Sequence, residues 1–125
     1  SEMTNTKTIL IIDDDEALRA ALEAKFSSKG YEVIACSDGA EGLEKLKTTL
    51  FSVIMTDLHM PNLDGFGILE QKADTKNADT PLYVITNLGS DTYCDKAIDL
   101  GAKKCFVKSV VTLRDVVETI DKEIA

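Results

Sequence analysis

The chain has 125 residues, of which 44% are hydrophobic and 29% are charged, close to ordinary globular usage. This length suits one domain with one core, and no apolar run approaches the ~20 residues that a membrane-spanning helix needs. A formal net charge of -8 argues against direct binding of nucleic acid, whose phosphates are neutralised mainly by Lys and Arg. We expect a soluble protein, with the cytoplasm as its compartment because the first residues lack a signal peptide's apolar segment.

Short apolar runs in regular alternation with helical patterns organise the rest of the chain. The predicted strands are Thr8 to Ile12, Glu32 to Cys36, Phe51 to Thr56, Leu82 to Thr86 and Cys105 to Val107. The predicted helices are Glu16 to Lys29, Gly39 to Leu50, a segment with Phe66, Leu69 and Ala73, a segment ending at Gly101, and a last one with Leu113, Val116, Val117, Ile120 and Ile124 facing inward. In the fourth helix, Ala97, Ile98 and Leu100 are expected to face inward, whereas residues 74 to 80 form a polar loop.

Five strands alternating with five helices favour an α/β fold, a parallel sheet with helices on both faces and right-handed crossovers. There is no internal repeat or linker. We therefore expect a disordered N-terminal segment over residues 1 to 6 and one domain over residues 7 to 125.

Two of the predicted strands end in acidic residues. Asp13 and Asp14 follow the first strand, and Asp57 follows the third. Each acid taken alone is most simply the start of a polar loop, but ligands of open parallel sheets bind beyond the carboxyl ends of the strands. Converging carboxylates raise each other's proton affinity unless a cation lies among them. Magnesium suits such oxygen ligands, and the backbone carbonyl of His59 is a candidate for a further one.

Three cysteines, Cys36, Cys94 and Cys105, fit no zinc-binding spacing, and the chain has only one His. We predict reduced and mostly buried thiols, because a free Cys usually behaves as a small core hydrophobe.

With these residues placed, residues 7 to 125 resemble the receiver domain of two-component response regulators. The resemblance implies the flavodoxin-like fold with strand order 2-1-3-4-5. It implies that Asp57 accepts a phosphoryl group from a phosphohistidine, that Asp13, Asp14, Asp57 and the His59 carbonyl hold Mg2+, and that Thr86 and Lys108 contact the phosphoryl group. Such a group needs cations and hydrogen-bond donors already in place, because it carries charge on its outer oxygens.

The resemblance also implies partners and a switch. The phosphoryl donor would be a sensor histidine kinase or a histidine phosphotransfer protein, and the face of the fourth helix, fifth strand and fifth helix would bind an effector or output domain. No membrane or nucleic-acid contact is implied, and a homodimer stays open. Such a domain is no enzyme in the ordinary sense, because it catalyses only its own phosphorylation and dephosphorylation.

Three positions depart from the family pattern. Ser109 follows Lys108 where the family has proline after a cis bond; a cis bond before a residue other than proline costs ~3 to 4 kcal/mol, so we predict a trans bond. Cys105 stands where the family has its switch aromatic, and Phe106 points to the opposite face of the strand. Asn87 replaces a small residue, so its amide would crowd the phosphate or donate to it.

Other functions remain as alternatives. The first is a degenerate receiver that binds partners without phosphorylation. The second is a small phosphatase of the haloacid dehalogenase type, in which Asp13 would be the nucleophile and Asp57 would have no role. A flavodoxin fits less well, because three adjacent acids in the first loop would repel a flavin phosphate.

Overall fold

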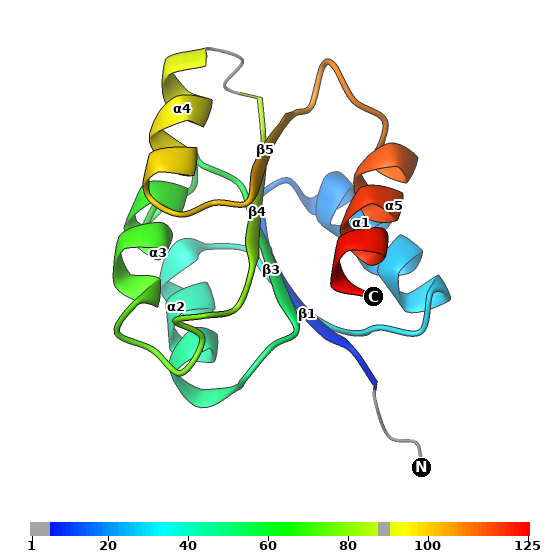
Figure 1. The fold of residues 1–125 in the computed structure, drawn as a ribbon, viewed down its shortest axis with the longest axis horizontal. Coiled ribbons are helices and arrows are strands. Elements are labelled where there is room, and N and C mark those ends of the chain that lie inside the picture. Colours follow the sequence, from blue (N-terminus) through cyan, green and yellow to red (C-terminus); the bar gives the residue numbers. More distant parts are fainter. Residues whose placement is uncertain (1–5, 88–90) are drawn as a thin grey trace.

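In the computed structural model, which describes residues 6–87 and 91–125, a parallel sheet is covered by helices on both faces (Figure 1). The strands are β1 (Thr8–Ile12), β2 (Glu32–Cys36), β3 (Val53–Thr56), β4 (Leu82–Thr86) and β5 (Lys104–Val107). The helices are α1 (Glu16–Ser28), α2 (Gly39–Thr48), α3 (Gly65–Lys72), α4 (Asp91–Asp99) and α5 (Leu113–Ile124). Residues 1–6 were predicted to be disordered. Of these, residues 1–5 lie outside the described residues.

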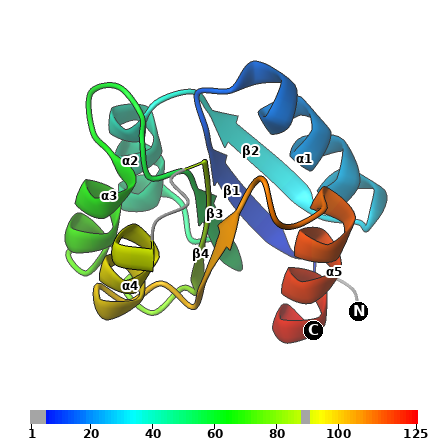
Figure 2. The same cartoon turned by 90° about the horizontal axis from the view of Figure 1, so that it is seen from above.

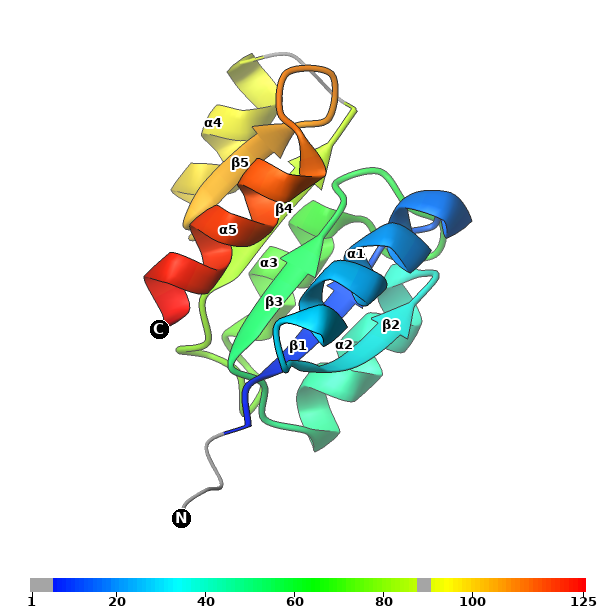
Figure 3. The ribbon, with the colours of Figure 1, turned by 90° about the vertical axis from the view of Figure 1, so that its right-hand side faces the viewer.

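The sheet order is β2-β1-β3-β4-β5, with every neighbouring pair parallel, so the expected order is confirmed. The strand arrows all point the same way in Figure 3. Helices α1 and α5 cover one face, and α2, α3 and α4 cover the other, as Figure 2 shows from above. All the strand ends that carry the predicted site residues therefore lie at one edge of the sheet.

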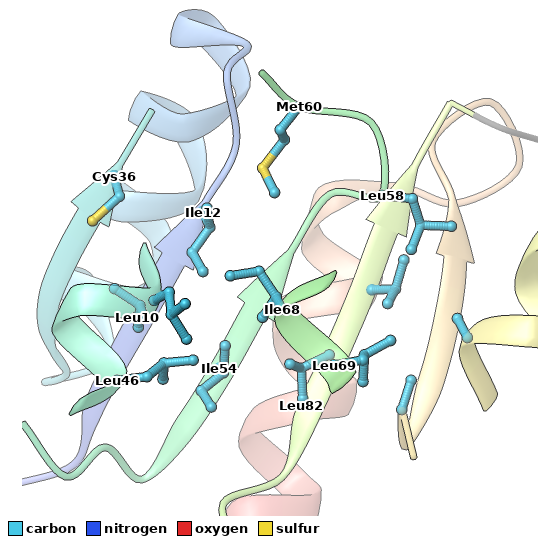
Figure 4. Close-up of a cluster of buried hydrophobic side chains, with 14 of the residues drawn as sticks. Leu10, Ile12, Cys36, Leu46, Ile54, Leu58, Met60, Ile68, Leu69 and Leu82 are labelled. Atoms are coloured by element: carbon cyan, nitrogen blue, oxygen red, sulfur yellow. The ribbon is translucent and has the colours of Figure 1, made fainter. Parts of the chain in front are cut away.

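Alternate residues of each strand enter different layers of the core, as the two-residue period of a strand requires. Leu10, Ile54 and Leu82 pack under α2 and α3 in the cluster drawn in Figure 4. Ile11 and Met55 pack on the opposite face under α1 and α5. Because both faces are buried, the central strands are almost continuously apolar, the pattern expected of a parallel sheet.

The inward stripe of α5 is confirmed, since Val116, Val117 and Ile120 are at most 1% exposed. The expectation for α4 is partly wrong. Ala97 is fully buried, but Ile98 is 44% exposed, because it lies on the solvent side of the helix. Within the described residues, no helix combines the length and the apolar character that crossing a membrane would require.

The prediction of reduced cysteines is also wrong for two of the three residues. Cys36 is a buried free thiol, whereas Cys94 on α4 and Cys105 on β5 form a disulfide with Cα atoms 5.5 Å apart. That separation lies within the ordinary range for disulfides. The pairing depends on how α4 folds back along β5, which the spacing of the cysteines along the chain does not reveal.

The segment predicted as a polar loop contains a buried side chain, Asn77, which is 0% exposed. Its Oδ1 accepts hydrogen bonds from the Phe51 amide (2.9 Å) and the Thr80 hydroxyl (3.0 Å). Its Nδ2 donates to the carbonyl oxygens of Leu46 (2.8 Å) and Thr49 (2.7 Å). One amide therefore joins the end of α2, the start of β3 and the loop before β4.

We predict that Asn77→Ala lowers the free energy of unfolding by about 3 kcal/mol, because several buried backbone groups, among them the Phe51 amide, lose their partner. Urea unfolding followed by circular dichroism measures the change. Gln71→Ala, an exposed position on α3, serves as the control and should change stability by less than about 0.5 kcal/mol. Equal stability of the two variants would contradict the prediction.

Candidate functional site

The register of the sheet places the acidic strand ends side by side. Ile12 of β1 pairs with Thr56 of β3, so Asp13 and Asp57 follow at neighbouring positions. The Asp57 amide donates to the Ile12 carbonyl (3.0 Å), which extends the pairing by one step beyond the strands. Asp13, Asp14 and Asp57 each offer a carboxylate oxygen within 4.8 Å of the others, so their predicted convergence is confirmed.

Asp57 is 6% exposed and held by the chain that follows it. Its Oδ1 accepts a 2.7 Å hydrogen bond from the Leu58 amide and a longer one, 3.5 Å, from the His59 amide. Gly65 comes so close that a Cβ there would collide with the Asp57 carbonyl oxygen. The turn between β3 and α3 thus fixes the Asp57 carboxylate and leaves its second oxygen, Oδ2, toward the site.

Lys108 lies between two of the acids. Its Nζ is 3.2 Å from Asp57 Oδ2, with which it forms a hydrogen bond, and 3.3 Å from Asp13 Oδ2. Its side chain is only 12% exposed. Burial by itself lowers the pKa of Lys108, but the negative charges of Asp13 and Asp57 outweigh this effect and raise it above its ordinary value. Lys108 is therefore a fixed positive charge in the site at neutral pH.

Asp13 is the most deeply buried acid of the site, at 1% exposure. Its Oδ1 accepts a hydrogen bond from the Asp15 amide (2.9 Å), while its Oδ2 has no hydrogen-bond partner. The Lys108 ammonium group forms an ion pair with Oδ2 at 3.3 Å. Burial raises the pKa of Asp13, the Asp15 amide opposes that shift, and the Asp57 charge adds to it. Asp13 thus carries a charge whose local compensation is incomplete.

Thr86 ends β4 and is fully buried, and its carbonyl accepts a 2.8 Å hydrogen bond from the Lys108 amide. A cavity of about 160 Å³ opens at this edge. It is lined by Asp14, Asp15, Asp57, His59, Thr86, Asn87 and Lys108. The structure therefore brings together every residue that the sequence nominated for the site, and it includes Asn87.

Two features of the site were missed in the sequence. Arg19 of α1 reaches back and donates from Nη1 to the Asp13 carbonyl (2.7 Å), which anchors the loop after β1. Asp15, the third acid of the run, is no obvious ligand, because its side chain caps α1 by accepting from the Leu18 amide (3.1 Å). An Asp directly before a helical pattern is a typical helix N-cap. This signal distinguishes Asp15, a cap, from Asp13 and Asp14, the candidate ligands.

The structure shows how two departures from the family pattern near Lys108, at Ser109 and Cys105, are accommodated. The Lys108–Ser109 bond is trans, as predicted, since the described residues contain no cis peptide bond. Cys105 packs in the layer of α2, α3 and α4, whereas Phe106 lies in the opposite layer and stacks on Tyr83, with ring centroids 6.4 Å apart. Phe106 therefore does not take the place of an aromatic residue at position 105.

We predict that Lys108→Met lowers the stability of the metal-free protein by about 3 kcal/mol, because it leaves two buried carboxylates without a counter-charge. Chemical denaturation in the presence of a chelator measures this loss. Lys103→Met, at an exposed position, is the control and should be nearly neutral. If both variants unfold at the same denaturant concentration, the pairing around Lys108 contributes nothing.

Comparison with known proteins agrees with this geometry. The family model described as response regulator receiver domain matches residues 9–121. A probable transcriptional regulator, ycf27, of Cyanophora paradoxa is 35% identical over 104 residues, which are 83% of this chain and 43% of the relative. The ycf27 protein of Pyropia yezoensis is 36% identical over 109 residues, 85% of this chain and 43% of the relative. The chain thus spans less than half the length of these curated relatives.

Among solved structures, a CheY-like response regulator receiver domain protein from Methanospirillum hungatei superposes with a TM-score of 0.88. It is 27% identical, and the match covers 96% of this chain and 94% of that one. The beryllofluoride-activated NtrC4 receiver domain is 28% identical, with a TM-score of 0.84 and coverage of 96% and 100%. Because the family model spans nearly the whole chain, this protein belongs to the family of response regulator receiver domains of two-component systems.

Proposed function

We propose that Asp57 is the phosphoacceptor of this receiver domain. The observation that carries the proposal is one buried, oriented carboxylate, at the edge of a small cavity, whose oxygens lie close to those of Asp13 and Asp14 and to the Lys108 ammonium group. Asp57 Oδ1 is tied to the Leu58 amide, so the carboxylate is held in one orientation before any donor arrives. Such preorganisation lowers the barrier for transfer of a charged group.

In the proposed reaction an oxygen of Asp57 forms a bond to phosphorus while the bond from phosphorus to the donor's histidine nitrogen breaks. The aspartyl phosphate then carries the negative charge that the donor brought. Lys108 already lies 3.2 Å from Asp57 Oδ2, so its ammonium group can pair with a phosphoryl oxygen with little movement. Thr86, at the end of β4, would contribute a hydroxyl donor from the next strand.

Receiver domains bind Mg2+ in an acidic pocket of this kind, and the residues here fit the ion. The buried Asp13 Oδ2 lacks a hydrogen-bond partner and lies in a group of three carboxylates, a donor set that suits a hard divalent cation. We propose that Asp13, Asp14, Asp57 and the His59 carbonyl hold it. When bound, Mg2+ supplies positive charge that offsets the charge on the phosphoryl oxygens.

The domain family acts in signalling between histidine kinases and output effectors and generally not as an enzyme on a separate substrate. For this chain we propose a histidine kinase or histidine phosphotransfer protein as the donor. We propose the face formed by α4, β5 and α5 as the surface whose effector binding changes after phosphorylation. The relatives named as probable transcriptional regulators make control of transcription the first output to test.

Intact-mass spectrometry after incubation with acetyl phosphate, with and without Mg2+, tests the proposal. We expect an adduct of one phosphoryl group that requires Mg2+ and that disappears after treatment with hydroxylamine, which cleaves acyl phosphates. If Mg2+ binds but no adduct forms, the phosphoacceptor proposal is wrong and a receiver acting without phosphorylation replaces it.

A further inference from the structure

A pair of cysteines joins two elements of the proposed output face. Cys94 of α4 and Cys105 of β5 are bonded through their sulfur atoms, and both side chains are half-buried. The third cysteine, Cys36, is 1% exposed, and burial raises the pKa of its thiol to about 11, so it is poorly suited to thiol exchange. The chain therefore has one fully buried thiol and one half-buried, bonded pair.

Helix α4 has few other anchors to the sheet. Ala97 is its only fully buried side chain among residues 92–99. Tyr93 stacks on Phe66 of α3 with ring centroids 6.4 Å apart, and Lys96 lies over the same ring at 4.4 Å, yet Tyr93 remains 42% exposed. The larger apolar side chain of Ile98 faces solvent. With so few other buried side chains, α4 is held against β5, next to which it lies in Figure 3, in part by the disulfide.

The other end of β5 leads directly into the proposed phosphorylation site. Cys105 pairs with Val84 and Val107 pairs with Thr86, so this part of the sheet is continuous up to Lys108. The Lys108 ammonium group contacts Asp57 across the cavity. A phosphoryl group on Asp57 would give Lys108 new partners, and the resulting adjustment of the end of β5 would reach Cys105 within three residues.

We propose that Cys94 and Cys105 form a reversible redox site that controls how far α4 responds to phosphorylation. In the disulfide form α4 is fixed to β5 and the response is restricted; in the dithiol form α4 can shift. This inference rests on the proposed function, because it concerns the regulation of the same switch.

The chemistry is thiol–disulfide exchange with a dithiol protein or small dithiol as the reductant. A thiolate of the reductant attacks one sulfur of the pair, and the bond between Cys94 and Cys105 breaks to give a mixed disulfide and one protein thiolate. The second thiol of the reductant then displaces the other cysteine. The protein gains two electrons and two protons and ends as two thiols, while the reductant ends as a disulfide. An oxidised dithiol reverses the reaction.

The test compares the oxidised and the dithiothreitol-reduced full chain, with thiols counted by alkylation and mass. Beryllofluoride with Mg2+ serves as the phosphoryl mimic, and NMR follows the backbone amides. We expect the Leu58 amide to shift in both forms, whereas the amides of α4 shift mainly in the reduced form. By linkage, the reduced form should bind beryllofluoride about fivefold more tightly or better.

Cys94→Ser removes the cross-link and should give the reduced-form response with or without oxidant. Cys36→Ala leaves the pair intact and should retain the difference between oxidised and reduced protein. Should Cys94→Ser fold poorly, Cys105→Ser provides the same test from the other side.

The outcomes separate this inference from the proposed function. Equal affinity and equal α4 shifts in the two forms, with the Leu58 amide responding in both, would overturn the redox site and leave the phosphoacceptor role standing. Failure of the pair to cross-link under oxidant would overturn it as well. If the Leu58 amide responds in neither form, the proposed function fails, and the redox switch fails with it.

Discussion

Asp57→Asn is expected to abolish phosphorylation by acetyl phosphate in the presence of Mg2+, with no adduct in the intact mass spectrum. The amide nitrogen and oxygen of Asn lack the nucleophilic charge of the carboxylate, so no bond to phosphorus forms. The fold should persist, because the Asn oxygen can still accept the hydrogen bond from the Leu58 amide. The effect is thus a loss of chemistry with retained structure.

Asp15→Asn provides the matched control. It is the same chemical change at a residue that lines the same cavity. Since Asp15 caps α1 and Asn caps a helix about as well as Asp, stability should change little. Phosphorylation should proceed at nearly the natural rate. An adduct of equal size on Asp57→Asn would show that another residue accepts the phosphoryl group.

Asp13→Asn is expected to raise the stability of the metal-free protein and to remove its stabilisation by Mg2+. The ionised Asp13 is buried, and its Oδ2 has no hydrogen-bond partner. Burial and the Asp57 charge raise the pKa of Asp13, although the Asp15 amide and the nearby Lys108 ammonium group oppose them, so the charged form is disfavoured in the folded state. Asn keeps the acceptor for the Asp15 amide and removes the charge.

The direction of the pH dependence follows from that raised pKa. An acid whose pKa is higher in the folded state than in the unfolded state costs stability once it ionises. The cost is absent below the ordinary Asp pKa, grows as pH rises from that value to the raised one, and is fully present above it. We therefore expect Asp13→Asn to be more stable than the natural chain at pH 7 in chelator, with little gain at acid pH.

In the presence of Mg2+ we expect the natural chain to be more stable than Asp13→Asn, the reverse of their order in chelator. Binding at about 100 times its dissociation constant stabilises the natural chain by about 2.7 kcal/mol, whereas the variant should gain almost nothing. Thermal unfolding with chelator and with Mg2+ measures both effects, and Asp15→Asn should behave like the natural chain. A full Mg2+ shift in Asp13→Asn would remove Asp13 from the proposed ligand set.

The local sequence determined most of the fold. The strands β1, β2 and β4 have the predicted bounds, β3 begins two residues later than predicted, and β5 begins one residue earlier. Apolar runs and helical stripes are set by residues close together in the sequence. The burial pattern of a helix such as α5 can therefore be predicted from the sequence alone. The convergence of Asp13, Asp14 and Asp57 was also predictable, because the carboxyl ends of parallel strands lie at one edge of the sheet.

Tertiary structure decided the contacts between elements distant in sequence. Asn77 lies in a polar segment, and only the approach of α2 and β3 turns its amide into a buried junction. Ile98 fits an inward pattern, yet it is 44% exposed in the folded protein. The sequence alone established a domain with an acidic site at the ends of its strands. The bond between Cys94 and Cys105 required the packing of α4 on β5, because a disulfide depends on a distance of a few ångströms that spacing along the chain does not specify.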